Sequence, residues 1–272
     1  MENPHGTLKL GWFSTGRGEG SRGLLLSVLN AIQLGSLDAS IEFVFCNREP
    51  GEDAGTDEFL SLVSSWEIPI IYLSSRRFAK EHDLRFKDVR RLYDKEVISM
   101  LGGFNAQICV LAGYMLIVST LLCDRYQLLN LHPAKPSGPI GTWREVIDAL
   151  IKQRATESGI MIHLATQHVD KGPVLSYCTF SIRNSSFEHL WAKLDQAEAV
   201  PDQPSLVTQT SEELFNFIRA RQLQHEQPFF VETLRALADQ RINPIPLISM
   251  PPIDLTKQVN DISNVDVIDS AS

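Results

Sequence analysis

Short apolar runs alternate with segments of helical spacing over the first half of the chain, and this alternation restricts the possible folds more than any other feature. Strands are expected at residues 8–14, 41–46, 68–73, 107–112 and 128–132, and helices at residues 24–34, 57–66 and 86–101. Strands that alternate with helices pair in parallel through right-handed crossovers. The pattern therefore predicts an α/β fold with a doubly wound, mainly parallel, Rossmann-like sheet.

The second half of the chain predicts a hairpin followed by helices. Strands at residues 159–165 and 174–182 flank a turn at 169–172, which is the pattern of a β-hairpin. Helices are expected at residues 142–153, 187–196, 211–221 and 229–240, with Pro228 breaking or kinking the chain between the last two. We expect one domain with its core at residues 8–183, a C-terminal helical extension at 184–245, and flexible tails at 1–7 and 251–272.

Composition argues against several classes of protein. The net charge of −8 makes the chain as a whole a poor candidate for binding nucleic acid or a membrane surface. Four cysteines are too widely spaced for a zinc knuckle, and two of them lie in apolar runs, so we expect buried thiols in a reducing compartment. No signal pattern and no membrane-length apolar run is present, and a cytoplasmic protein is the default expectation.

A glycine-rich loop follows the first predicted strand. Gly18 to Gly23 fit G-x-G-x-x-G, and the loop opens a helix, so backbone N–H groups and the helix dipole would face an anion there. A dinucleotide site would also need an acid at the end of the second strand, where the chain has Asn47 and Arg48 instead. We expect an anion site at residues 20–23, and a tight turn without a ligand is the alternative.

The fifth predicted strand ends in polar residues. Side chains alternate along a strand, so Asn130 and His132 point to the same face, and Pro133 ends the pairing. Open α/β sheets place ligands at the carboxyl ends of their strands. An amide that can donate to a carbonyl oxygen and an imidazole that can exchange a proton near neutral pH would lie there side by side.

Three stretches together resemble the formyltetrahydrofolate-dependent formyltransferases, and within them the glycinamide ribonucleotide (GAR) formyltransferases. These stretches are Asn130-Leu131-His132-Pro133, Gly159-Ile160-Met161-Ile162-His163 and Val169-Asp170-Lys171-Gly172-Pro173-Val174. The resemblance implies that Asn130, His132 and Asp170 are catalytic, with Asn130 stabilising an oxyanion, His132 moving a proton and Asp170 orienting His132 or a water molecule. It extends over residues 8–183 and, more weakly, over a helix at 224–242.

The same resemblance implies binding residues for two substrates and no metal. Met115, Leu116, Ile117 and Val118, together with Arg90, would bind the co-substrate 10-formyltetrahydrofolate. Gly20, Ser21, Arg22 and Glu226 would bind a phosphorylated ribose amine. The sequence departs from the family at Arg22, where the family has Asn, at Leu116, where close members often have Arg, and in the loop after His132. These departures concern substrate contacts more than chemistry.

Several alternatives stay open at this point. His163 is equally well a partner of the site or a buried core histidine, and a metal held by His163, His168 and Asp170 has little support. The expected reaction is formyl transfer to the amine of GAR, a step of purine biosynthesis. Its rivals are a formyltetrahydrofolate hydrolase, a sugar-nucleotide N-formyltransferase, and a nucleotide- or folate-binding module, with NADP bound through Arg48 in one version. The sequence does not predict the oligomeric state.

Overall fold

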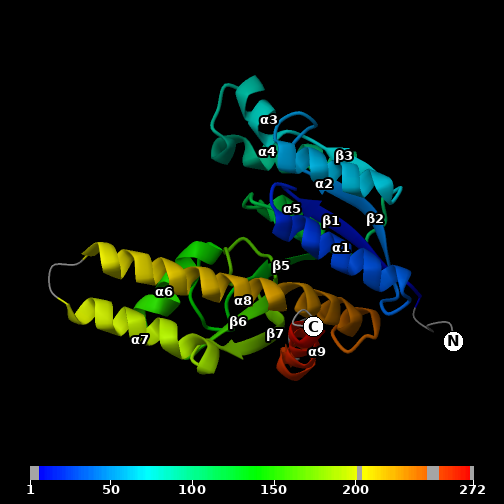
Figure 1. Cartoon of the computed structure of the whole chain (residues 1–272). Helices are drawn as coiled ribbons and strands as arrows, with labels where there is room; N and C mark the ends of the chain where they lie inside the picture. The colour runs from blue at the N-terminus through cyan, green and yellow to red at the C-terminus, as the bar shows by residue number, and fades with distance from the viewer. Residues whose placement is uncertain (1–5, 201–203, 244–250, 270–272) are drawn as a thin grey trace. The chain divides into compact units, whose positions relative to one another are not determined.

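The structure, a computed structural model, describes residues 6–200, 204–243 and 251–269, and within these the chain divides into two compact units that interleave along the sequence (Figure 1). The first unit takes residues up to 131, 162–175 and 233–251, and the second takes 132–161, 176–232 and the residues from 252 onward. The boundary expected at residue 184 therefore does not coincide with a boundary of the structure. Of the two expected tails, residues 1–5 lie outside the described residues.

From β1 to β5 the chain alternates strands and helices, as the pattern predicts. The elements are β1 (Leu8–Ser14), α1 (Glu19–Gln33), β2 (Ala39–Cys46), α2 (Ala54–Ser65), β3 (Ile70–Tyr72), α3 (Ser75–Glu81), α4 (Phe86–Met100), β4 (Ile108–Leu111), α5 (Thr120–Arg125) and β5 (Leu128–His132). Helices α3 and α5 were not predicted, because one or two turns are too short to show an apolar period.

The remaining elements include one very long helix. They are α6 (Trp143–Lys152), β6 (Glu157–Leu164), β7 (Val174–Ser181), α7 (Ser185–Ala199), α8 (Pro204–Ala238), β8 (Ile253–Asp254) and α9 (Thr256–Asp269). Of the break or kink expected at Pro228, the break is wrong, because α8 continues through this residue. No helix within the described ranges is both long enough and apolar enough to cross a membrane.

The strands form one mixed sheet in the order β3-β2-β1-β4-β5-β6-β7-β8. In the first unit β1 pairs in parallel with β2 and β4, and β4 pairs in parallel with β5. Phe13 is in register with Leu111, and Leu111 is in register with Asn130. The carboxyl ends of β1, β4 and β5 therefore lie at one edge, which confirms the predicted mainly parallel α/β sheet.

Strands β6 and β7 form the predicted hairpin. The amide of Leu164 donates to the carbonyl of Pro173 at 2.9 Å, and the amide of Ile182 donates to the carbonyl of Thr156 at 3.0 Å. Going from Thr156 to Leu164 along β6, the hydrogen-bonded partner changes from Ile182 back to Pro173. The two strands therefore run in opposite directions, as in an antiparallel pair. The turn of this hairpin carries Asp170.

Aromatic side chains fill the first unit between the sheet and helices α4 and α5. The Phe13 ring lies 5.8 Å from Phe43, 5.4 Å from Phe45 and 5.7 Å from Tyr114, in tilted or edge-on contacts. A side chain at Gly11 would meet the Phe43 ring at 2.6 Å, so only glycine fits at that point of β1. Each such buried ring stabilises the fold by about 2 kcal/mol. This packing stabilises the strands of the first unit whose carboxyl ends carry the candidate site residues.

The four cysteines are free thiols, as predicted. Cys46, Cys109 and Cys178 are buried, and Cys123 is partly buried. Burial raises the pKa of Cys46 to about 11, so this thiol is neutral at physiological pH.

The expected flexible tail at 251–272 is wrong for the described residues 251–269. Ile253 pairs in parallel with Ser176 of β7, and the amide of Leu255 donates to the carbonyl of Tyr177 at 2.9 Å. Helix α9 then packs on α8, where Asn260 Oδ1 lies 3.0 Å from His225 Nε2. A two-residue strand and a few polar contacts hold this segment, and neither produces a periodic pattern in sequence.

Candidate functional site

Asn130 is the centre of a hydrogen-bonded cluster with His163 and Asp170, all in the first unit. Its Nδ2 atom lies 3.1 Å from His163 Nε2 and 3.3 Å from Asp170 Oδ1. His163 Nδ1 lies 3.1 Å from the carbonyl oxygen of Leu164, so Nδ1–H donates there and Nε2 accepts from Asn130. The Asn130 amide therefore donates one proton to each neighbour. Of the two alternatives left open for His163, this contact identifies it as a partner of the cluster.

The turn that carries Asp170 is held in one conformation by the hairpin. Asp170 has a φ of 54°, in the left-handed region, which Asp tolerates better than most residues. Two residues later, a Cβ atom on Gly172 would lie 1.7 Å from the carbonyl oxygen of Leu164. The backbone of the turn thus packs directly on the end of β6. This contact fixes the carboxylate of Asp170 relative to Asn130.

His132 lies two residues beyond Asn130, at the end of β5, and belongs to the second unit. The ring is 2% exposed, and its Nε2 lies 3.0 Å from the carbonyl oxygen of Pro139. In the same unit the carbonyl of Pro133 accepts a hydrogen bond of 3.1 Å from Gln222 of α8. These bonds orient the imidazole and the loop after β5.

The glycine-rich loop is shorter than predicted, because α1 begins at Glu19. Gly20, Ser21 and Arg22 thus lie in the first turn of the helix, with extended Gly18 as its N-cap and no side chain capping it. A Cβ atom on Gly20 would meet nothing within 4 Å, so the space beside it is open. Arg22 turns toward α2, with its Nη1 atom 3.0 Å from Glu58 and 3.3 Å from the carbonyl of Gly55.

The segment expected to bind the formyl donor presents apolar side chains to solvent and is anchored at both ends. Met115 is 72% and Ile117 55% exposed, whereas Val118 is buried. The amide of Met115 donates to Thr15 Oγ1 at 2.9 Å, and the amide of Ser119 donates to Asp94 Oδ2 at 2.6 Å. Anchored backbone with exposed apolar side chains suits contact with an apolar ligand.

Arg90 lies on α4, one turn before the buried carboxyl group of Asp94. Burial raises the pKa of Asp94, while the hydrogen bonds from Ser119 and the positive charge of Arg90 oppose that rise. Arg90 is partly buried, and its charge stabilises the Asp94 carboxylate that holds the backbone of Ser119.

Glu226 is a buried residue of α8 in the second unit, and its Oε1 atom accepts a hydrogen bond of 2.6 Å from Arg219. Its carboxylate is thus already in an ion pair. Among the residues that the structure describes, no three His, Cys, Asp or Glu side chains are arranged to hold a metal ion.

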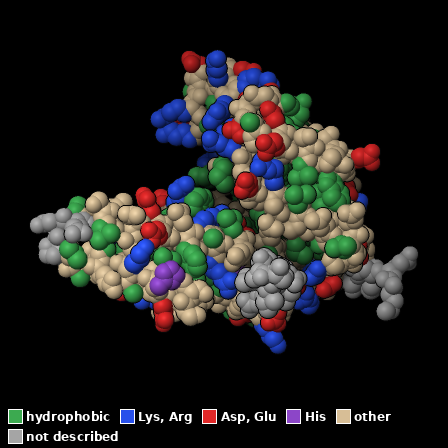
Figure 2. Space-filling model, viewed as in Figure 1, with side chains coloured by type: hydrophobic (Ala, Val, Ile, Leu, Met, Phe, Trp, Pro, Cys, Tyr) green, Lys and Arg blue, Asp and Glu red, His purple; other side chains and the backbone are tan. Residues whose placement is uncertain are grey.

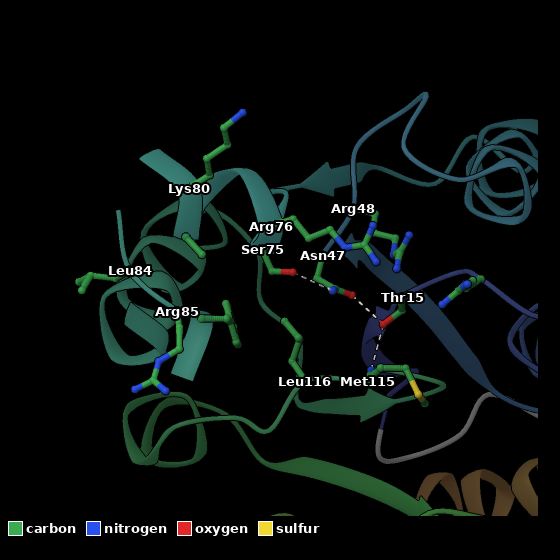
Figure 3. Close-up of a pocket in the computed structure, with 13 residues that line it drawn as sticks. Thr15, Asn47, Arg48, Ser75, Arg76, Lys80, Leu84, Arg85, Met115 and Leu116 are labelled. Carbon is green, nitrogen blue, oxygen red and sulfur yellow. Dashed lines mark hydrogen bonds between the residues drawn. The ribbon is translucent and has the colours of Figure 1, made fainter. Parts of the chain in front are cut away.

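A pocket that sequence reasoning missed lies in the first unit, where the residues that follow β1 and β2 meet α3 (Figure 3). Its volume is about 640 Å³. Thr15 Oγ1 donates to Asn47 Oδ1 at 2.8 Å, and Asn47 Nδ2 donates to Ser75 Oγ at 3.3 Å. The pocket is lined by Thr15, Arg17, Asn47, Arg48, Ser75, Arg76, Ala79, Lys80, Leu84, Arg85, Phe86, Met115 and Leu116. The polar residues directly after β1 and β2 were its only signal in the sequence.

Comparison with known proteins confirms the predicted fold class and the resemblance to the formyltransferases. The chain is 34% identical over 92 residues to phosphoribosylglycinamide formyltransferase of Escherichia coli (strain K12), a match that covers 32% of this chain and 42% of that protein. The matched stretch of this chain thus spans less than half the length of that relative.

Two solved structures share the fold at low sequence identity. Glycinamide ribonucleotide transformylase 1 from Symbiobacterium toebii has a TM-score of 0.61 at 18% identity, over 86% of this chain and 89% of that one. A formyltetrahydrofolate deformylase from Pseudomonas syringae pv. tomato has a TM-score of 0.60 at 19% identity, over 86% and 62% of the two chains. The profile of the formyl transferase family matches residues 18–200, which is more than half of the chain. The chain therefore belongs to the formyl transferase family.

Proposed function

We propose that this protein transfers the formyl group of 10-formyltetrahydrofolate to the amine of 5-phosphoribosylglycinamide. The observation that carries the proposal is the Asn130–His163–Asp170 cluster at the carboxyl edge of the sheet. It offers a neutral amide donor and a carboxylate within one hydrogen bond of each other. Formyl transfer needs both, because an oxyanion forms and a proton must leave the attacking amine.

The reaction begins when the amine nitrogen bonds to the formyl carbon and the carbonyl oxygen takes the electron pair. A donor directed at such an oxyanion is typically worth about 3 kcal/mol. Asn130 supplies it by turning one N–H from Asp170 to the oxyanion, because the 3.3 Å bond to Asp170 is the longer of its two hydrogen bonds. The other N–H stays on His163 and keeps the amide oriented.

Asp170 accepts the proton of the attacking amine, directly or through a water molecule. A carboxylate that loses a hydrogen-bond donor becomes more basic, because the charged form is less stabilised. The turn of Asn130 toward the oxyanion therefore makes Asp170 a better base at the step that needs one. The proton then passes to the folate nitrogen as the bond between that nitrogen and the formyl carbon breaks.

His132 is also proposed to assist the reaction, because residues two apart on a strand point to the same face and because the stretch 130–133 resembles the formyltransferases. A protonated ring there stabilises the oxyanion, and a neutral ring carries the amine proton. His163 positions Asn130, without itself touching the substrate.

The acceptor is proposed to be anchored by its phosphate at the first turn of α1. Strand β4 separates β1 from β5, so the ends of β1 and β5 lie about 10 Å apart. A ribose phosphate with a short glycyl arm bridges that distance, with its phosphate at Gly20 and Ser21 and its amine beside Asn130. The side chains of Met115, Leu116 and Ile117, with Arg90, are proposed to face the folate, and the buried Val118 supports them from the core. Arg22 pairs with Glu58 and Glu226 pairs with Arg219, so each must exchange that partner to contact the acceptor.

Hydrolysis is the second candidate, and the fold likeness to a formyltetrahydrofolate deformylase supports keeping it. The same cluster could activate water in place of an amine. Single-turnover release of formyl from the donor, measured with GAR, with an amino-sugar nucleotide and with neither, distinguishes the reactions. We expect release to depend on GAR. An equal rate without any amine would identify a hydrolase, and release driven only by the amino sugar would change the acceptor while retaining the mechanism.

A further inference from the structure

The pocket beside α3, at the ends of β1 and β2, concentrates positive charge that the proposed formyl transfer does not use. Its described lining includes five Lys and Arg side chains and no Asp or Glu. It belongs to a wider basic surface, since residues 76–95 hold eight Lys and Arg against four Asp and Glu, in a chain of net charge −8. Figure 2 shows Lys and Arg side chains gathered over α3 and α4. Such a concentration attracts anions.

Two of the pocket's guanidinium groups are placed to hold one anion between them. Arg48, directly after β2, has a side chain only 9% exposed, and its Nη1 atom lies 3.6 Å from the carboxylate of Asp53. Arg76, on α3, extends toward Arg48 across the pocket, whereas Lys80 points away from it (Figure 3). No acidic side chain among the described residues pairs with Arg76. Asp53 also accepts from Arg17 at 3.3 Å, so one carboxylate faces two arginines.

The position of this arginine pair in the sheet indicates the kind of anion. In doubly wound sheets the ribose of a nucleotide lies at the end of the second strand, where an acid binds its free hydroxyls and an arginine accommodates a phosphate on the ribose. Here that position holds Asn47 and Arg48. The planar fork of arginine matches phosphate oxygens two at a time, which a lysine cannot do.

The rest of the pocket suits a ring attached to such a phosphate. Ala79, Leu84 and Phe86 provide apolar surface next to the arginine pair, apart from Leu116, which is proposed to bind the folate. The hydrogen-bonded residues Thr15, Asn47 and Ser75 hold the ends of β1 and β2 and the start of α3 together, so the pocket is preformed. We infer that this pocket binds a ribonucleotide that carries a phosphate monoester on its ribose, with the phosphate on Arg48 and Arg76 and the base on the apolar wall.

The experiment is calorimetric titration of the full chain, without folate, using adenosine 2′-monophosphate, adenosine, inorganic phosphate and tri-γ-glutamate as probes. We expect the monophosphate to bind about tenfold or more tightly than adenosine, since charge-assisted hydrogen bonds to phosphate contribute about 1.5–3 kcal/mol. Arg76→Gln should weaken that binding about tenfold or more. The matched control is Arg91→Gln, an exposed arginine of α4 outside the pocket, and it should leave the dissociation constant unchanged.

Arg76 is exposed, so its replacement does not threaten the fold, and Arg48→Lys adds a second variant that keeps the charge and removes the fork. Equal affinity for adenosine and its monophosphate, or an affinity that neither variant changes, would overturn the inference. Tighter binding of tri-γ-glutamate than of the monophosphate, lost in Arg76→Gln, would assign the pocket to an oligocarboxylate and also overturn it. Because no formyl donor is present, these outcomes are independent of the single-turnover test of formyl transfer.

Discussion

The Asn130 cluster and the basic pocket lie at the same edge of the same sheet, yet their polar groups are arranged in opposite ways. In the cluster every proton of the Asn130 amide already has an acceptor, and a rigid turn holds the carboxylate. In the pocket five cations share the lining, and Arg76 has no acidic partner among the described residues. A satisfied cluster can exchange one hydrogen bond during a reaction, whereas excess like charge is relieved only when an anion binds. The first arrangement suits chemistry, and the second suits recognition.

The largest expected effect is a loss of turnover when a proposed catalytic residue is replaced. Asp170→Asn should lower turnover about 10²–10⁴-fold, because the amide cannot accept the amine proton. Asn tolerates the left-handed conformation of residue 170, so the variant should fold normally. His132→Ala should also lower turnover by orders of magnitude. Steady-state formyl transfer measures both effects, with Asp124→Asn, an exposed acid of α5, as the control. Near wild-type turnover in either variant would remove that residue from the mechanism.

A second effect tests whether the cluster depends on its turn. Gly172→Ala should lower the free energy of unfolding by about 2–3 kcal/mol, because its Cβ would lie 1.7 Å from the Leu164 carbonyl oxygen. Urea denaturation measures the change. Gly103→Ala is the matched control, since a Cβ there meets nothing within 4 Å. If the two variants are equally stable, the turn yields easily and cannot be what positions Asp170.

The third effect tests whether the acceptor's phosphate and the pocket's ligand occupy separate places. Gly20→Asp should raise KM for the acceptor roughly tenfold through repulsion of its phosphate, with kcat little changed. The space beside Gly20 is open, so the side chain fits. Binding of adenosine 2′-monophosphate should change less, because Gly20 does not line the pocket. An unchanged KM would mean that the first turn of α1 is not the phosphate site.

The smallest effect concerns the contact between α8 and α9, outside both regions. Burial is the largest cause that lowers the pKa of His225 below its ordinary value of 6.5. The unfolded chain therefore binds a proton at His225 more readily than the folded chain does. The stability that neutral, buried His225 contributes is present above pH 6.5 and is lost as the pH falls below it. We expect the unfolding free energy to fall by at most about 1.4 kcal/mol per pH unit there. Urea titrations of the wild type and His225→Gln between pH 7.5 and 5 measure it, and parallel curves would contradict the assignment.

Strand and helix order could be predicted because it depends on local patterns. The alternation up to β5, the hairpin around Asp170 and the capping box of Thr142 and Glu145 all follow from apolar spacing and turn chemistry within a few residues. Asn130, His132 and Asp170 were identified by stretches that resemble a known family. Within the first unit the structure brings Asn130 and Asp170 together.

Other features depended on contacts between distant parts of the chain. The segment of β8 and α9 is ordered because it pairs with β7 and packs on α8. One of these contacts, between Thr179 and Thr256, joins residues 77 positions apart, so no periodicity in the sequence reveals it. The contact between His163 and Asn130 forms only because β5 and β6 are neighbours in the sheet. The basic pocket forms only where the ends of β1 and β2 meet α3. Local patterns carry the information for secondary structure, because each residue's backbone preference acts within a turn or a strand. Burial, ion pairing and the convergence of charge require partners that only the folded chain supplies.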